Sequence, residues 1–296
     1  MNASSLILAT GCQKDYELLD SGDGEKLERY GAVILSRPDP QALWPKHLSE
    51  KEWQKAQAVF SRDDKAAKWE FRGPVPERWQ IEFVDLKFHI HPSSFKHTGL
   101  FPEQAPNWDW MRGLIRNQKS ETRSQISVLN LFAYTGGATL AAAQAGASVC
   151  HVDGSRVALN WARDNAEVSG LDRKPIRWIL DDVVTFVERE VKRGRKYDGI
   201  IMDPPAFGHG PKKEMWRIED DLLPLFGLCK KVLSDTPLFF LANGYASGYS
   251  AIAYGNNVEY IMKDWPGKME IGELAIEESK SGRLLPCGIF ARWSST

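Results

Sequence analysis

Short apolar runs alternate with amphipathic stretches along residues 107–264. The apolar runs predict strands, which we place at residues 127–132, 147–152, 176–180, 198–202 and 237–242. The intervening stretches predict helices, which we place at residues 136–145, 155–168, 182–192, 217–233 and 249–264. This alternation favours right-handed βαβ units and a parallel sheet that helices cover on both faces. Two further runs, "MEIGELAIEES" and "RLLPCGIFARW", predict an antiparallel hairpin at the end of the chain.

The first part of the chain has a different pattern, rich in Pro, Gly and Trp. The runs "YGAVILSR", "AKWEFRG" and "RWQIEFVDLKFHIH" alternate with period two, which indicates antiparallel strands. The stretch "SEKEWQKAQAVFSR" (49–62) is the one clear helix prediction among them. We therefore predict an α/β protein with a small α+β domain over residues 1–94. A domain with a Rossmann-like, mostly parallel seven-stranded sheet and the antiparallel C-terminal hairpin follows over residues 95–296.

Composition and charge exclude several classes of protein. The 296 residues include 38 basic and 39 acidic ones, so the net charge of −1 demands no polyanionic partner. The four cysteines lie far apart without a CxxC pair, which suits reduced thiols better than disulfides or zinc. The first residues show neither a basic n-region nor a long apolar h-region, so we expect no signal peptide, and no apolar run reaches the roughly 20 residues that a membrane span needs. We expect a cytoplasmic protein without a membrane span, and the oligomeric state stays open.

Three successive strand ends carry residues suited to a nucleoside. Gly136 and Gly137 stand between the first predicted strand of this domain and its helix, where free N–H groups and a closely approachable backbone can hold a ligand. Asp153 ends the next strand, and a carboxylate there can accept the hydroxyls of a ribose. Asp182 follows the third strand and can accept from an adenine amine. The alternative is an ordinary βα turn with an acid on the surface after each strand. The occurrence of all three features at successive strand ends favours the nucleoside site over that alternative.

The turn does not fit a dinucleotide. The G-x-G-x-x-G fingerprint needs earlier glycines to admit a pyrophosphate, and Phe132 and Tyr134 occupy those places. Two glycines suit a ligand that carries an amino acid tail.

Five segments together resemble a known family: "FKHTGLFPEQ" (95–104), "NLFAYTGG" (130–137), "HVDGS" (151–155), "ARDNAEVSGL" (162–171) and "MDPPAFG" (202–208). The chain resembles class I S-adenosylmethionine (SAM)-dependent methyltransferases, and among them the bacterial 23S ribosomal RNA large-subunit methyltransferases. The resemblance implies SAM as cofactor and RNA, most of all ribosomal RNA, as partner. It implies cofactor contacts from the following residues: Lys96, Thr98, Phe101, Gln104, Phe132, Ala133, Tyr134, Thr135, Gly136, Asp153, Gly154, Ser155, Asn165 and Asp182.

The segment "YDGIIMDPPAFGHG" predicts a buried strand that ends at the methyl-transfer site. Asp203 can accept a hydrogen bond from an attacking amine, Pro204 and Pro205 stiffen the loop, and Phe207 can stack on a base. A Pro-Pro turn with Phe207 in the core is the structural alternative. Methylation at cytosine C5 needs a cysteine nucleophile. The segment after the fifth strand, "LFFLANGYASGYS", has Asn243 and Tyr245 but no cysteine, which favours an amine or another heteroatom as acceptor.

Other signals carry less weight. His89 and His91 form a His-x-His pair without an acidic or thiolate partner nearby, so no metal site is predicted. The run "KRGRK" (192–196) should lie at the far end of the sheet, whereas Arg217 and the lysines of "GPKKEMWR" (210–217) border the site and suit phosphates. A methyltransferase for a protein or small molecule and a non-catalytic SAM-binding protein remain as alternatives.

Overall fold

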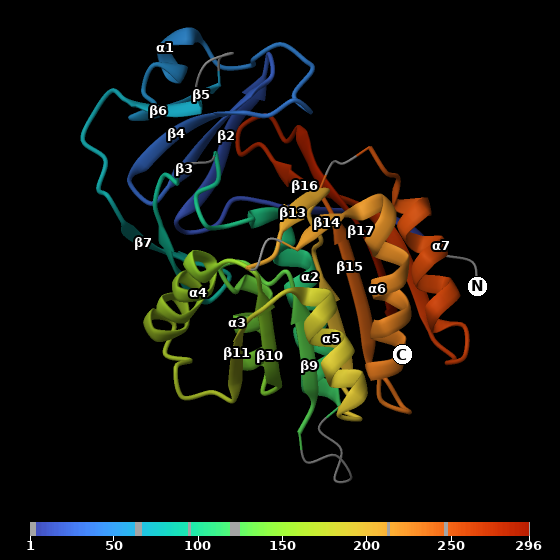
Figure 1. Ribbon diagram of the computed structural model, residues 1–296. Coiled ribbons are helices and arrows are strands. Elements are labelled where there is room, and N and C mark those ends of the chain that lie inside the picture. The colour runs from blue at the N-terminus through green and yellow to red at the C-terminus, as the bar shows by residue number, and fades with distance from the viewer. Residues whose placement is uncertain are drawn as a thin grey trace. The chain divides into compact units, whose positions relative to one another are not determined.

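The computed structural model describes residues 4–62, 67–93, 96–118, 125–211, 214–245 and 248–295 (Figure 1). The chain forms two compact units. Unit 1 comprises Met1–Leu8, Pro106–Leu274 and Gly288–Thr296, and unit 2 comprises Ala9–Ala105 and Ala275–Cys287. The predicted domain boundary at residues 94 and 95 lies outside the described residues. The tip of the C-terminal hairpin belongs to unit 2. A single boundary between an N-terminal and a C-terminal domain therefore does not describe the two units.

Unit 1 is built on an eight-stranded sheet with the order β1-β16-β17-β15-β12-β9-β10-β11. Its strands are β1 (Ser4–Thr10), β9 (Ser127–Leu131), β10 (Ser148–Asp153), β11 (Ile176–Leu180), β12 (Gly199–Met202), β15 (Phe239–Gly244), β16 (Lys268–Glu277) and β17 (Leu284–Ser294). The five strands from β15 to β11 pair in parallel, and β17 pairs antiparallel with β15. The predicted parallel sheet with an antiparallel C-terminal hairpin is confirmed.

The predicted count of seven strands is wrong by one, because β1 adds an edge strand next to β16. The two strands approach closely at Gly272, where a side chain would overlap the carbonyl group of Leu6. Pairing between segments so far apart in the sequence leaves no local signal. The prediction that the apolar start of the chain belongs to the N-terminal domain is therefore wrong for β1.

Helices cover both faces of this sheet. They are α2 (Ala105–Asn117), α3 (Gly137–Gln144), α4 (Arg156–Val168), α5 (Val183–Lys192), α6 (Ile218–Val232) and α7 (Ala251–Met262). Helices α5, α6 and α7 lie together on one face (Figure 1), and their apolar side chains form one buried core with the strands. The predicted bounds of α3 to α7 agree with the structure to within two residues. No helix among the described residues is long and apolar enough to cross a bilayer.

Unit 2 contains two small sheets. The first has the order β2 (Tyr16–Gly22), β3 (Glu25–Tyr30), β4 (Val33–Pro38), β5 (Ala58–Arg62), β6 (Ala67–Phe71), and the second pairs β7 (Trp79–Phe83) with β8 (Leu86–Ile90). A short helix, α1 (Glu50–Trp53), and a 3-10 turn, η1 (Pro102–Gln104), complete it. The predicted antiparallel strands of this region are present.

The helix predicted over residues 49–62 is wrong beyond Trp53. Residues Ala58–Arg62 form β5, which pairs with β4 and β6. Ala58 and Phe60 are buried on one side of the strand, so burial between two neighbouring strands outweighs the helical pattern of the preceding residues.

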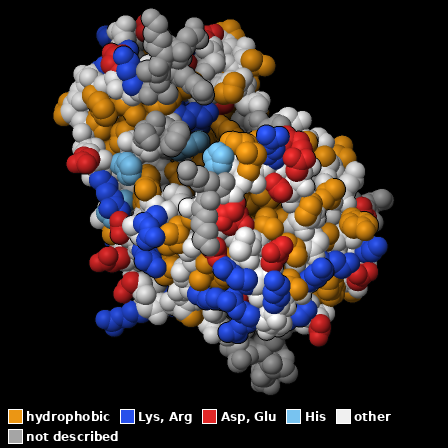
Figure 2. Space-filling model, in the orientation of Figure 1, with side chains coloured by type: hydrophobic (Ala, Val, Ile, Leu, Met, Phe, Trp, Pro, Cys, Tyr) orange, Lys and Arg blue, Asp and Glu red, His pale blue; other side chains and the backbone are white. Residues whose placement is uncertain are grey.

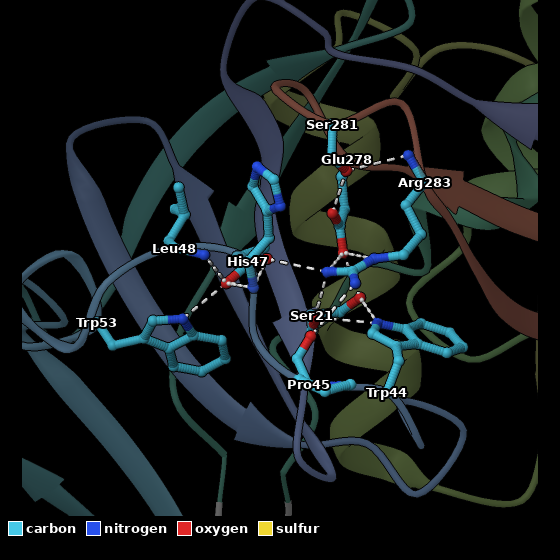
Figure 3. Close-up of polar contacts among 10 residues, drawn as sticks. Ser21, Trp44, Pro45, His47, Leu48, Trp53, Glu278, Ser281 and Arg283 are labelled. Carbon is cyan, nitrogen blue, oxygen red and sulfur yellow. Dashed lines mark hydrogen bonds and ion pairs between the residues drawn. The ribbon is translucent and has the colours of Figure 1, made fainter.

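A buried polar cluster ties the tip of the C-terminal hairpin to β2 within unit 2 (Figure 3). Arg283 donates to the Asp20 carboxylate at 3.2 Å, to the Ser21 carbonyl at 2.7 Å and to Glu278. Asp20 also accepts from Trp53 Nε1 at 2.8 Å. Each carboxylate is thus paired and hydrogen-bonded, as buried charges require.

Candidate functional site

The register of the parallel strands places several predicted residues in one row. Leu131 of β9 lies level with Val152 of β10 and Met202 of β12, and Met202 lies level with Ala242 of β15. Strands β10 and β11 follow β9 on one side of it, whereas the next strand, β12, lies on its other side. The strand order therefore reverses at β9, and such a topological switch point is where α/β sheets bind ligands. The residues one step further along each chain form the row, which consists of Phe132, Asp153, Asp203 and Asn243.

The turn after β9 has an unusual backbone. Phe132 and Tyr134 have φ values of +54° and +48°, the left-handed region that glycine prefers. Two bulky residues therefore adopt the conformation that glycines would give, at a cost of about 1–3 kcal/mol each. Backbone strain of this kind gathers at ligand sites and supports a binding role for the turn.

Gly136 and Gly137 have a packing role that the sequence did not reveal. A Cβ on Gly136, which has φ +91° and caps α3, would lie 3.1 Å from Ala162. A Cβ on Gly137 would overlap the indole ring of Trp108. The two glycines therefore allow close packing of α3 against α4 and α2. The expectation that they also open the backbone to a ligand stays a prediction.

Asp153 is held by the two segments that surround it. Its carboxylate accepts from the N–H of Tyr134 at 2.8 Å and from the N–H of Ser155 at 2.7 Å. Burial raises the pKa of Asp153, and the two backbone hydrogen bonds oppose that rise. Each oxygen keeps a further lone pair, so the carboxylate can accept two ribose hydroxyls, the role predicted for it.

Buried polar residues hold the turn after β9 and the start of α3 in place. The fully buried Asn165 donates to the carbonyl of Thr135 at 2.9 Å. Thr139 Oγ1 lies 2.9 Å from both Asn130 Nδ2 and His151 Nδ1, and burial lowers the pKa of His151 to about 3. Asn165 was predicted to contact the cofactor. In the structure its amide fixes the carbonyl of the turn.

Ala133 and Ser155 also have backbone or capping roles. The N–H of Ala133 donates to the Val152 carbonyl at 3.1 Å and joins the turn to β10. Ser155 caps α4 and accepts from the N–H of Ala158 at 3.3 Å. Gly154 lies between Asp153 and this cap, and a Cβ there would lie 3.5 Å from Pro211.

Asp182 caps α5. Its Oδ1 accepts from the N–H of Thr185 at 2.9 Å, while Oδ2 would lie 3.2 Å from a Cβ on Gly210. One oxygen therefore serves the helix and the other faces the loop around Gly210, which leaves Oδ2 for the predicted hydrogen bond from adenine.

The Asp203-Pro204-Pro205 segment follows β12 directly. Burial raises the pKa of Asp203 to about 6. Pro204 is buried and Pro205 is exposed, and the carbonyl of Pro205 accepts from Trp216 Nε1 at 2.6 Å. The ring of Trp216 packs on Phe132 with 4.9 Å between centroids, so this tryptophan joins the proline loop to the turn after β9. Trp216 is a residue of this region that was not predicted from sequence, and its place in "GPKKEMWR" next to Arg217 is the signal that could have identified it.

A two-stranded ribbon of β13 (Phe207–His209) and β14 (Met215–Arg217) continues from the prolines. Phe207 pairs with Arg217 and His209 with Met215, and these four are exposed whereas Trp216 is buried. Phe207 has 53% of its side chain exposed and its ring lies 5.0 Å from that of His209. It is not a core residue, which contradicts that part of the structural alternative, and its stacking role stays a prediction. Lys212 and Lys213 lie outside the described residues.

Four of the predicted cofactor contacts belong to unit 2 and form one segment there. The carbonyl of Lys96 accepts from Arg37 Nη1 at 2.9 Å, and Thr98 is buried. The ring of Phe101 lies 5.3 Å from that of His97, and the N–H of Gln104 donates to the Phe101 carbonyl at 3.2 Å. Their contact with a cofactor stays a prediction.

Two further predictions concern metals and basic residues. No group of three His, Cys, Asp or Glu residues in the described parts of the chain is arranged to hold a metal. Residues 192–196 are exposed where α5 ends, and Lys and Arg side chains gather over that part of the surface (Figure 2). They precede β12, so they lie at the end of the sheet away from the row of site residues.

The comparisons with known proteins agree with this geometry. A family model described as S-adenosylmethionine-dependent methyltransferase matches residues 48–221. A SAM-dependent methyltransferase from Agrobacterium tumefaciens superposes with a TM-score of 0.93 at 35% identity, covering 100% of this chain and 97% of that one. SMU.776, a methyltransferase solved with S-adenosylhomocysteine (SAH), has a TM-score of 0.70 at 18% identity, which shows the fold alone.

Two curated relatives act on ribosomal RNA by name. Ribosomal RNA large subunit methyltransferase K of Neisseria meningitidis is 29% identical over 75% of this chain and 64% of its own length. Methyltransferase K/L of Vibrio campbellii is 30% identical over 72% of this chain and 27% of its own length. The chain therefore spans less than two thirds of these relatives.

Proposed function

Because the chain belongs to the S-adenosylmethionine-dependent methyltransferase family, we propose that it methylates a base of ribosomal RNA at an amine or another heteroatom. The observation that carries this proposal is the row at the strand ends. Asp203 follows β12, the neighbour of β9, and the turn after β9 is fixed by the hydrogen bond from Tyr134 to Asp153. The names of the curated relatives support RNA as substrate. A ribosomal RNA substrate would in turn place the protein in the cytoplasm.

The cofactor would be held by the turn after β9 and by the two acids. The turn from Phe132 to Gly136 would take the methionine part, Asp153 the ribose hydroxyls and Asp182 Oδ2 the adenine amine. When bound, SAM supplies an electrophilic methyl group on a sulfonium. Methyl transfer is then an in-line displacement, which depends on the position of the acceptor.

The residues of the chain position that acceptor. Asp203, ionised above pH 6, accepts a hydrogen bond from the attacking amine and orients its lone pair. Pro204 and Pro205 offer no N–H donor and hold the loop, and the exposed ring of Phe207 can stack on a base taken out of its helix.

Cytosine C5 chemistry is a weaker candidate, because it needs a thiolate. Three of the four cysteines are buried. Burial raises the pKa of Cys150 to about 11 and raises the pKa values of Cys229 and Cys287 as well. A buried thiol with a raised pKa is a poor nucleophile. Incubation with RNA that contains 5-fluorocytosine distinguishes the two routes, since a covalent adduct that disappears with one Cys→Ala change would establish C5 methylation.

The main test is mass spectrometry of ribosomal RNA nucleosides from cells with and without the gene. We expect one methylated nucleoside to disappear with the gene. The purified protein with labelled SAM should restore it on RNA from the deletion cells. Identical nucleosides and no labelling of RNA would contradict the proposal and favour a protein or small-molecule substrate, or a non-catalytic role.

A further inference from the structure

Asn243 lies beside Asp203 at the carboxyl edge of the sheet. The two residues follow the paired residues Ala242 and Met202 on neighbouring parallel strands, so their Cα atoms are separated by about the strand spacing of 4.8 Å. Level residues on adjacent strands point to the same side of a sheet. The packing of the Phe239 ring on Gly199, a level pair four residues earlier on the same strands, supports this register.

A chain of buried hydrogen bonds decides which way the Asn243 amide points. Arg292 is a donor only, and its Nη1 donates to Asn107 Oδ1 at 3.1 Å. The opposite end of the Asn107 amide, Nδ2, then donates to Asn243 Oδ1 at 3.0 Å. Since the oxygen of Asn243 faces Asn107, its NH₂ group must point away from Asn107.

Arg292 is itself fixed in place. It donates to Glu270 Oε2 at 2.8 Å, and its guanidinium lies 4.7 Å from the ring centroid of Trp110. Asn107, Asn243 and Arg292 are all buried. Reversal of the Asn243 amide would set its NH₂ group against the NH₂ group of Asn107, and reversal of both amides would set a donor against Arg292, so the orientation is specified.

We infer that the Asn243 NH₂ group is a substrate contact of the methyl-transfer site, oriented by Asn107 and Arg292. It donates to a lone-pair atom next to the nitrogen that Asp203 holds. No hydrogen bond from this NH₂ group occurs within the described residues. A carboxylate acceptor beside an amide donor fits a base edge that presents an amine next to a lone-pair ring nitrogen, as adenine, cytosine and the 2-amine edge of guanine do. Uracil offers no such amine.

This inference rests on the proposed RNA substrate, and its test has a readout that needs no turnover. The probe is the side-chain NH₂ signal of Asn243 in ¹⁵N NMR spectra of the SAH-saturated protein, assigned through Asn243→Ser. At least one of adenosine, cytidine and guanosine should shift this signal, and uridine should leave it unchanged. Arg292→Lys should broaden or move it before any nucleoside is added. An equal response to all nucleosides, or no response to any of them, would overturn the inference.

Turnover on RNA provides the second readout. Asn243→Ala should lower kcat/KM about 3- to 10-fold, the effect of one neutral hydrogen bond, and leave SAH affinity within about 2-fold. Asn256→Ala is the matched control, because Asn256 is exposed on α7. Unchanged turnover in Asn243→Ala would contradict the inferred substrate contact and leave the proposed function intact. A nucleoside-specific shift of the NMR signal without any methylation of RNA would contradict the proposed RNA substrate and leave the inferred contact intact.

Discussion

The N–H of Tyr134, a residue with left-handed backbone geometry, donates to the carboxylate of Asp153 at 2.8 Å. This hydrogen bond joins the turn after β9 to the end of β10. One contact therefore links the turn proposed to hold the methionine part of the cofactor to the carboxylate proposed to hold the ribose. Strain in the turn and the raised pKa of Asp153 are both costs that a bound ligand can offset.

Replacing Asp153 with Ala should weaken SAH binding about 10- to 150-fold, because a charge-assisted hydrogen bond contributes about 1.5–3 kcal/mol. Calorimetric titration measures the change. Asp172→Asn, an exposed acid after α4, is the control and should bind normally. Equal affinities for Asp153→Ala and the native protein would refute the ribose role.

The half-buried carboxyl group of Asp203 should lower stability in its ionised form, because desolvation disfavours the charge. Its pKa is about 6 in the folded protein and 3.8 when unperturbed, so the folded state binds more protons between these values. The free energy of unfolding therefore falls as pH rises through this window. Asp203→Asn should raise that free energy by about 1–3 kcal/mol at pH 8 and by less as pH falls towards 4.

Urea unfolding of native and Asp203→Asn proteins at several pH values tests this, with Asp172→Asn as control. The variant should also keep its SAH affinity and lose most turnover. A pH-independent difference in stability would show that the carboxylate is not desolvated. Turnover within a few-fold of the native protein would exclude the positioning role.

Gly137 should not tolerate a methyl group. Gly137→Ala would place a Cβ on the ring of Trp108, and overpacking of this kind costs about 1–3 kcal/mol. Gly113 lies within α2 with no atom near its Cβ position, so Gly113→Ala should stabilise by up to about 1 kcal/mol. Thermal unfolding of both variants gives the comparison. Similar midpoints would show that α2 does not pack on the turn.

Arg283 should be a main contributor to the stability of unit 2. Arg283→Met leaves Asp20 and Glu278 without their cation, and removal of one partner of a buried ion pair costs about 3–5 kcal/mol. We expect about 2–4 kcal/mol in urea unfolding, since Asp20 keeps backbone and tryptophan donors. Arg173→Met, at an exposed position, should change stability by less than about 0.5 kcal/mol. Equal effects of the two variants would show that the cluster does not hold the hairpin tip.

The sequence by itself determined the parallel sheet, the order of its helices and the acids that follow its strands. These features repeat a local pattern, since apolar runs between Ser127 and Gly244 must be buried on both faces and each helix begins with its own signals. Asp153, Asp182 and Asp203 could be named because each stands at the end of such a run or within two residues of it.

Only the tertiary structure decided the features that depend on residues far apart. The pairing of β1 with β16, the strand at Ala58–Arg62 and the packing of Trp108 on Gly137 each involve a partner that the local pattern does not contain. The orientation of Asn243 depends on Asn107 and Arg292, which lie 136 and 49 positions away from it in the chain. A hydrogen bond between such residues needs the folded sheet to bring donor and acceptor together, because it has no periodicity that a sequence could display.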